Sequence, residues 1–235
     1  MIIHKPSFSA ALTHEQLPSY LVLAICANAA PHSKDIAAKA PVPRLAGVPF
    51  FQEAVSVMFD ASGRLLAEPN IETAQALCLL ELHEVSASHS WTKHYRYFGK
   101  HAYGYFFLRR VRYLTVSIAL CSLHIFHPID LALKILEESL DVSRADEPSL
   151  TTPPLSPGSR TLCIERECTR RCFWLIQVMC WINGIYTFRP MRPRSVDLMR
   201  RVRLPADETS FELAVPVQGP GGKILTSDLY WQCTS

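Results

Sequence analysis

Residues 160–187 read RTLCIERECTRRCFWLIQVMCWINGIYT, and this stretch decides the fold class. Its first half is charged, whereas its second half, from Phe173 to Tyr186, is almost entirely apolar. Such a pattern predicts one long helix that starts at the protein surface and finishes in the core. We expect this helix to end before Arg189 and Pro190, because proline removes a backbone donor and clashes with the preceding turn.

Apolar residues three or four positions apart predict further helices upstream of this stretch. We expect them over residues 19–30, 48–61, 71–85, 91–98 and 129–140. The third is the most regular, since Asn70 suits an N-cap and residues 76–80 are apolar on every side. Its predicted core stripe consists of Ile71, Ala74, Cys78, Leu82 and Val85. We therefore place this helix at the centre of the domain.

The composition of the 235 residues favours an all-α fold. Hydrophobic residues make up 49% and charged residues 19%, which excludes a disordered chain and a polytopic membrane protein. Nine glycines against 17 prolines favour helices joined by proline-rich loops over a glycine-rich barrel. We expect one irregular multi-helix domain over residues 1–215, with a proline-rich loop at 147–159 and a disordered C-terminal tail at 216–235.

The eight cysteines and nine histidines form no recognisable metal or redox motif. No C-x-x-C pair occurs, and Cys163 and Cys168 are five residues apart, so a helix points them in different directions. We see no secretory signal, and we therefore interpret the thiols as small buried hydrophobes rather than disulfides. His83, His89 and His94 lie six and five residues apart, a spacing that does not place them on one helical face.

Sequence motifs for catalysis are missing as well. The chain contains no nucleophile elbow, no phosphate-binding loop and no dinucleotide fingerprint. The glycine-rich turn at 219–222 is followed by no predicted helix, which makes it a poor cradle for phosphate. We therefore predict that this chain is not an enzyme and holds no catalytic residue, cofactor or metal ion.

Two uncharged runs raise the question of a membrane segment. Residues 113–126 and 173–188 contain 14 and 16 residues without a formal charge, whereas about 20 are needed to cross a bilayer core. Three arginines precede the first run, as they would at a cytoplasmic flank. The alternative we retain is a membrane-associated helical protein anchored by residues 103–126, but we favour a protein without a membrane contact.

Residues 160–203 carry ten arginines against three acidic residues. Such an excess can mark a nucleic-acid-binding face. The interpretation we favour instead pairs Arg170 and Arg171 with neighbouring carboxylates and lets Arg189 and Arg192 satisfy carbonyl groups at the end of a helix. We therefore expect no direct DNA contact from this segment.

A set of motifs along the chain resembles a known family. One part of the set is Glu167-x-x-Arg170-Arg171-x-Phe173-Trp174, followed by the Arg189-Pro190 loop and by residues 202–208 (VRLPADE), which contain Leu204 and Pro205. Residues 2–8 (IIHKPSF) and 71–80 (IETAQALCLL) match the same family in the same order. The chain thus resembles, over most of residues 1–213, the regulatory domain, or middle homology region, of fungal Zn₂Cys₆ transcription factors.

The resemblance implies an all-helical, nuclear, non-catalytic domain that modulates transcription. Its partners would be a small-molecule effector or transcriptional co-regulator proteins, and a second copy of the chain is an open alternative. The family contacts DNA and holds zinc through a six-cysteine cluster, and no C-x₂-C-x₆-C pattern occurs here. We therefore expect DNA contact and zinc only in a missing N-terminal cluster, and we expect the chain to be a truncated gene model or a separated regulatory domain.

Residues 99–128 depart from the family pattern as an atypical insertion. The segment is rich in Tyr, Phe, Leu and Arg, and Gly99-Lys100 can be encoded by GGTAAG, a usual intron start. Our hypothesis is that the segment is a translated intron. Sequencing of the mature transcript should then show a message that lacks it, and a message that retains it at full abundance would contradict the hypothesis.

Overall fold

The structure is a computed structural model, and it describes residues 1–87, 128–144, 157–187 and 196–213. Within these ranges every named element is helical, and an isolated β-bridge joins Phe59 and Leu65. The predicted all-α class is therefore confirmed. The chain divides into two compact units, Met1–Leu17 with Leu133–Ser235 (unit 1) and Pro18–Ala132 (unit 2), which we describe separately. The prediction of one domain over 1–215 stays a prediction.

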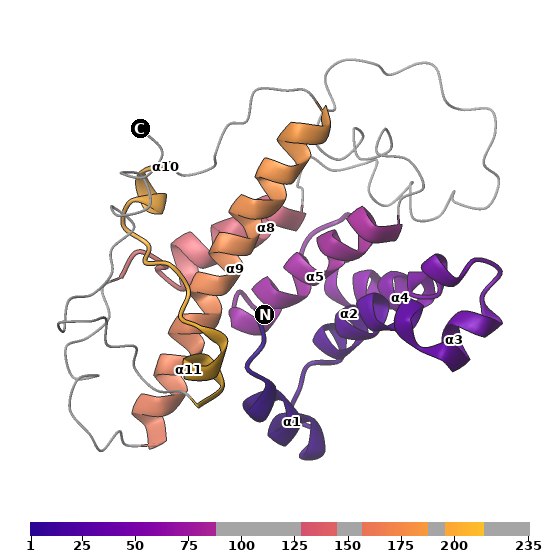
Figure 1. Cartoon of the computed structure of the whole chain (residues 1–235), viewed down its shortest axis with the longest axis horizontal. Helices are drawn as coiled ribbons and strands as arrows, with labels where there is room; N and C mark the ends of the chain where they lie inside the picture. The colour runs from indigo at the N-terminus through magenta and orange to yellow at the C-terminus, as the bar shows by residue number, and fades with distance from the viewer. Residues whose placement is uncertain (88–127, 145–156, 188–195, 214–235) are drawn as a thin grey trace. The chain divides into compact units, whose positions relative to one another are not determined.

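Unit 2 is built around three helices, and its described elements are short helices joined by turns (Figure 1). In chain order they are α2 (Ser19–Ala29), η1 (Ala30–His32), α3 (Lys34–Lys39), η2 (Pro43–Leu45), α4 (Val48–Met58), α5 (Ile71–Ala87) and most of α8 (Pro128–Lys134). Helix α2 packs against both α4 and α5. The helices predicted over 19–30, 48–61 and 71–85 are present, with ends that differ by one to three residues.

Small side chains allow α2 to lie close to its neighbours. Ala24 and Ala27 are completely buried, and Leu21 is nearly so. The side chain of Asn28 donates hydrogen bonds of 2.9 Å both to the carbonyl of Ala24 in its own helix and to the carbonyl of Leu79 in α5. The buried surface of α2 therefore includes a hydrogen bond to α5, and this bond fixes the position of α2 along α5.

Helix α5 contributes much of the buried surface of unit 2, but α2, which packs against both α4 and α5, takes the central place that the sequence predicts for α5. The side chain of Asn70 accepts a hydrogen bond of 2.9 Å from the backbone N–H of Thr73, which confirms the predicted N-cap. Leu77, like the other residues of the all-apolar stretch 76–78, has no exposed surface. The predicted core stripe is wrong at Leu82, which is 36% exposed, because helical periodicity does not show how far a neighbouring element covers each side of a helix.

Helix α4 ends at Met58, three residues before its predicted end. The carboxylate of Asp60 accepts hydrogen bonds from the backbone N–H groups of Ser62 and Arg64 at 2.8 and 2.9 Å. Gly63 adopts φ 80° in this turn, a conformation that glycine reaches without strain. The tight turn replaces the last predicted turn of helix because the short acidic side chain satisfies these backbone donors locally.

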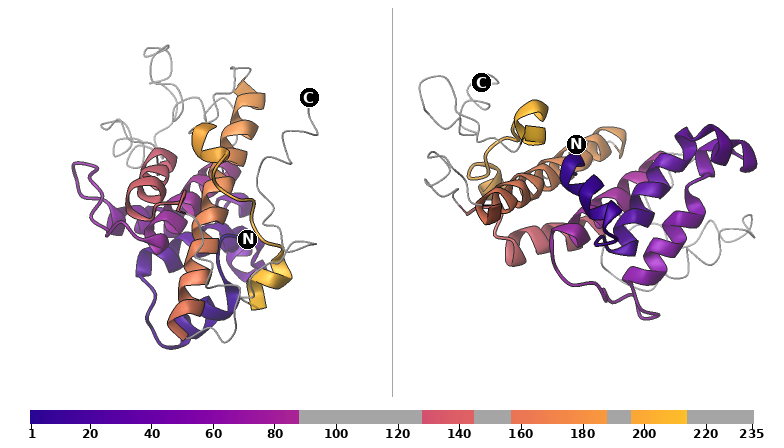
Figure 2. Two further views of the ribbon diagram at one scale, coloured as in Figure 1. Left: turned by 90° about the vertical axis from the view of Figure 1, so that its left-hand side faces the viewer. Right: turned by 90° about the horizontal axis from the view of Figure 1, so that it is seen from below.

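Unit 1 contains one long helix and several short ones (Figure 2). They are α1 (Lys5–Thr13), the π-helical segment η3 (Ile135–Ser139), α9 (Pro157–Thr187), α10 (Val196–Met199) and α11 (Glu208–Leu213). The helix predicted over 129–140 is present as α8 followed by η3. Helix α9 ends at the predicted residue and begins three residues early, so the last part of the predicted loop 147–159 is helical; proline is well tolerated in a first helical turn.

Helix α1 was not predicted, because residues 5–13 show little apolar periodicity. It begins with His4 as its N-cap, whose ring accepts from the backbone N–H of Ser7, and with proline in its first turn. Local capping therefore defines this helix more than a buried stripe does.

Several predicted features lie outside the described residues. They are the helix at 91–98, the segment 99–127, the loop at 147–156, Arg189 and Pro190, and the tail at 216–235. Among the helices that the structure does describe, none has both the length and the apolar character needed to cross a membrane.

Gly47 precedes α4 and provides a test of the packing of unit 2. A Cβ atom added there would lie 1.9 Å from the carbonyl oxygen of Ala27 and 2.7 Å from the ring of His83. We expect Gly47→Ala to lower the free energy of unfolding by about 2 kcal/mol, because a backbone oxygen cannot move aside cheaply. Urea denaturation measures this change, with Ser56→Ala on the exposed face of α4 as the control. A Gly47→Ala protein as stable as the control would contradict this packing.

Candidate functional site

Three charged residues of the family motif gather on one side of α9. Glu167, Arg170 and Arg171 follow the i, i+3, i+4 spacing that brings side chains together on a helix. Glu167 Oε1 accepts from Nε of Arg171 at 2.9 Å, and Oε2 accepts from Nε of Arg170 at 2.9 Å. The side chains of Glu167 and Arg171 are only 8% and 6% exposed. The predicted pairing of both arginines with a neighbouring carboxylate is thus confirmed.

Arg171 extends this pair to parts of the chain that are distant in sequence. Its Nη1 donates to the carbonyl of Met1 at 2.8 Å and to Oε2 of Glu208 at 2.6 Å. Its Nη2 donates to the carbonyl of Ala206 at 2.6 Å, and Glu167 Oε1 accepts from the N–H of the same residue at 2.8 Å. We call Glu167, Arg170, Arg171 and Glu208, with these backbone groups, the Arg171 cluster. It joins the N-terminal segment and the 202–208 segment to α9.

An aromatic ring closes the Arg171 cluster on one side. The guanidinium carbon of Arg171 lies 4.0 Å from the centre of the buried Phe211 ring of α11, a distance at which the ring face attracts a cation. His4 meets the same ring edge-on at 5.1 Å. Figures 1 and 2 show α11 beside the N-terminal half of α9, where these contacts occur.

His4 connects α1 to α11 through both nitrogens of its ring. Nε2 lies 3.1 Å from the carbonyl oxygen of Glu212. Because a carbonyl oxygen can only accept, Nε2 carries a hydrogen atom and donates this hydrogen bond. Nδ1 then accepts from the hydroxyl of Ser7 at 2.7 Å and from its backbone N–H at 3.3 Å. Lys5 Nζ adds an ion pair of 2.6 Å with Glu212. Residues 2–8 (IIHKPSF) contain no local pattern that predicts the contacts of His4 and Lys5, because Glu212 lies about 200 residues away in the sequence.

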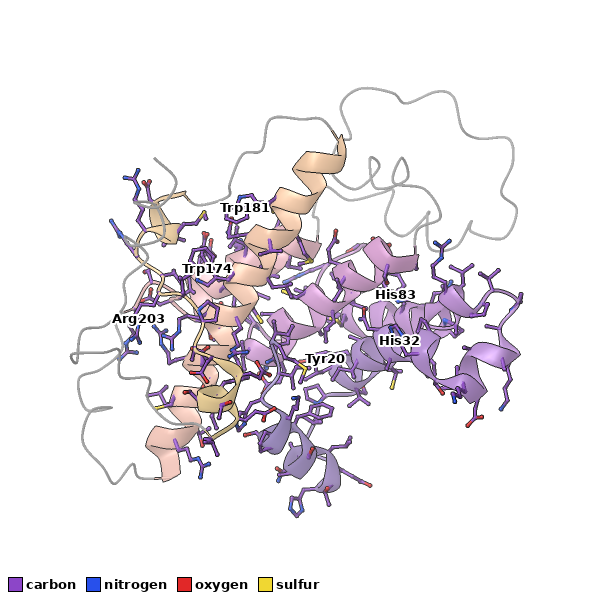
Figure 3. All side chains as sticks on the ribbon, viewed as in Figure 1. Tyr20, His32, His83, Trp174, Trp181 and Arg203 are labelled. Atoms are coloured by element: carbon purple, nitrogen blue, oxygen red, sulfur yellow. The ribbon has the colours of Figure 1, made fainter. Side chains whose placement is uncertain are left out.

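The remaining motif residues have different positions. Phe173 is completely buried, and Trp174 donates from its indole N–H to the carbonyl of Arg203 at 2.8 Å. Figure 3 shows Trp174 next to the segment that carries Arg203. Leu204 is 40% exposed and Pro205 is also exposed. The backbone of 202–208 is thus attached to α9, whereas these two predicted side chains lie at the surface.

Arg166 has a role that the sequence did not indicate. Its guanidinium donates to three carbonyl groups just after η3, those of Leu140, Asp141 and Arg144. Asp141 has φ 43°, which is typical of a residue that ends a helix in the left-handed conformation. Burial lowers the pKa of Arg166 from its ordinary value. Arg166 therefore caps the C-terminal end of η3 and attaches η3 to α9.

The described cysteines and histidines do not assemble into a reactive centre. The six cysteines that the structure describes are thiols, of which Cys78, Cys168 and Cys172 are buried. His83 is buried in α5, while His89 and His94 lie outside the described ranges. Over the part of the chain with described coordinates, no group of three or more His, Cys, Asp or Glu side chains could hold a metal ion.

The geometry of the Arg171 cluster suits stable attachment rather than chemistry. Its carboxylates are held by arginines, and Arg171 keeps the pKa of Glu208 below its ordinary value by donating a hydrogen bond to it. Comparisons of the chain with protein-family models, with curated proteins and with solved structures found no match. The cluster is therefore assessed on its contacts alone.

The Arg171 cluster can be tested by removing one charge and then both. We expect Arg171→Met to lower the free energy of unfolding by about 3 kcal/mol, because the acceptors around it lose a buried partner. Adding Glu167→Met should cost less than the sum of the two single changes, since a charge is then no longer left buried.

The control is the exposed pair Lys134–Glu138, whose atoms lie 3.8 Å apart. Glu138→Gln should change the free energy of unfolding by less than about 0.5 kcal/mol. Urea denaturation measures these values for five proteins, which are the original chain, Arg171→Met, Glu167→Met, the double variant and Glu138→Gln. An Arg171→Met protein as stable as the Glu138→Gln protein would show that the cluster does not hold unit 1 together.

Proposed function

We propose that this chain is a regulatory domain of the fungal Zn₂Cys₆ transcription-factor family, which modulates transcription without catalysing a reaction. The single observation that carries the proposal is the Arg171 cluster. Residues 2–8, 167–174 and 202–208 suggest the family separately. Hydrogen bonds of the cluster connect 167–174 to Ala206 in the third segment and to Met1, the residue next to the first segment. Motifs that depend on one another physically are expected to occur together in proteins that share a fold.

The helical character of the described residues supports the same proposal, because the family domain is all-helical. Regulation would then pass through contacts with co-regulator proteins or a small-molecule effector, in the nucleus. The proposal assigns no DNA contact and no zinc to this chain, because no C-x₂-C-x₆-C pattern occurs among its cysteines. It assigns no catalytic residue either.

A reporter assay tests the proposal directly. The full chain is fused to an unrelated DNA-binding domain with an activation domain, and transcription from a matching promoter is measured in a fungal host. We expect the chain to change reporter output. The assay is repeated with metabolites from a cell extract added to the host cells. Reporter output equal to that of the fusion without the chain under both conditions would contradict a regulatory role.

Two substitutions in α5 provide matched controls for this assay. Leu77→Asp places a charge at a position with no exposed surface and should unfold the domain, which abolishes the effect on the reporter. Leu82→Asp places the same charge on the same helix where the side chain is 36% exposed, so the effect should persist. Loss of circular dichroism and of a melting transition in the first variant alone confirms the comparison.

Cell fractionation separates the proposal from the membrane alternative, whose segment 103–126 lies outside the described residues. A regulatory domain should be found in the nuclear fraction and should be released by carbonate extraction. Retention in the membrane pellet after carbonate treatment is expected only of an anchored protein.

A further inference from the structure

His83 occupies the point where three helices of unit 2 meet. Its side chain lies on α5 and is 2% exposed. The ring stacks on Phe51 of α4 with ring centres 5.2 Å apart and planes inclined by 28°. The missing side chain of Gly47 allows the start of α4 to approach both this ring and the carbonyl of Ala27 in α2. Figure 3 shows His83 among the side chains of these helices.

Within the described residues neither ring nitrogen of His83 has a hydrogen bond of good geometry, although the backbone carbonyl of Ala27 lies close enough to the ring to act as a weak acceptor. A neutral imidazole can remain in such surroundings, whereas an imidazolium has two N–H donors and a charge to satisfy. Burial lowers the pKa of His83 from its ordinary value, and the carbonyl of Ala27 acts against this by raising it. The folded unit therefore favours the uncharged ring.

Charged groups on the surrounding elements do not compensate a proton on His83. They are Glu81 and Glu84 on α5, Glu53 on α4 and Arg44 on η2, while α2 supplies only the neutral titratable groups of Tyr20 and Cys26. The shift of the pKa arises from burial and from the Ala27 carbonyl, without a contribution from any of these charges. A proton on the ring would thus be a buried charge, with the Ala27 carbonyl as an acceptor on one side.

We propose that protonation of His83 opens the contact between α4 and α5, so that unit 2 loosens when the pH falls. The Ala27 carbonyl can accept from one N–H of the imidazolium, but the other N–H gains water as a partner only if the ring leaves the face of Phe51 and the space beside Gly47. Helix α4 is the element that must move, because it supplies both of these contacts. This regulatory device does not depend on the proposed function.

The direction of the effect follows from proton linkage. The folded state holds His83 at a lowered pKa, while the unfolded or opened state has the ordinary value of about 6.5. The stabilising contribution of the neutral ring is therefore complete above about pH 6.5 and is lost progressively as the pH falls below it. Glu81 acts in the opposite sense, since burial raises the pKa of its carboxyl and makes acid favourable for folding.

Hydrogen exchange of the full chain tests the proposal at about pH 7.5 and about pH 5.5, with rates corrected for intrinsic exchange. At the lower pH we expect the protection of amides in α4 to fall by up to about tenfold relative to amides in α9. Tenfold is the limit for the binding of one proton when the pH lies one unit below the ordinary pKa of the group that binds it. His83→Phe retains an aromatic ring without a titratable group and should remove this difference. Glu81 is unchanged in that variant, so its contribution cancels in the comparison.

His32→Gln is the matched control, because His32 is an exposed histidine of the same unit. It should behave as the original chain does. Unchanged protection of α4 in the original chain, or an equal loss in His83→Phe, would overturn the proposal. If His83→Phe does not fold, NMR titration of the Hε1 resonance of His83 in the original chain decides, since His83 should titrate below the ordinary histidine value of about 6.5. Titration of His83 at or above that value would likewise overturn the proposal.

Discussion

The buried guanidinium of Arg171 is the constraint on which unit 1 depends. A cation removed from water must meet acceptors in several directions, and its own helix supplies one carboxylate, that of Glu167. The other acceptors are carbonyl groups of Met1 and Ala206 and the carboxylate of Glu208. Because these groups come from distant parts of the chain, satisfying one side chain requires both segments to lie against α9. The positions of α1 and α11 follow from this requirement.

The two units use buried polar groups in different ways. Guanidinium groups stay charged at cellular pH, and the hydrogen bond from Arg171 holds the pKa of Glu208 below its ordinary value, so this attachment weakens only when the pH falls far enough to protonate that carboxylate. His83 in unit 2 is held neutral by burial and can gain a charge under mildly acidic conditions. One unit therefore contains a charged buried cluster, whereas the other contains a buried neutral ring.

Local features of the structure follow closely from the sequence. The N-cap Asn70, the end of α9 at Thr187 and the pairing of Arg170 and Arg171 with Glu167 all depend on residues within one or two helical turns. Leu82 shows where this reasoning fails, because the periodicity of a helix does not say which neighbour covers each side. The capping of η3 by Arg166 was missed for a similar reason, since the carbonyl groups it binds lie more than 20 residues away.

The sequence by itself determined the helical class, the N-cap of α5 and the charged and apolar halves of α9, since these depend on periodicity, capping and short spacings. Only the tertiary structure decided that Arg171 meets Met1 and Ala206, and that Gly47 brings α4 against Ala27 and His83. These contacts involve backbone groups and small residues, and the sequence around such groups does not indicate which partner they meet. Their identity is decided by which surfaces meet when the chain folds, because hydrogen bonds and steric fit act over a few ångströms and not along the chain.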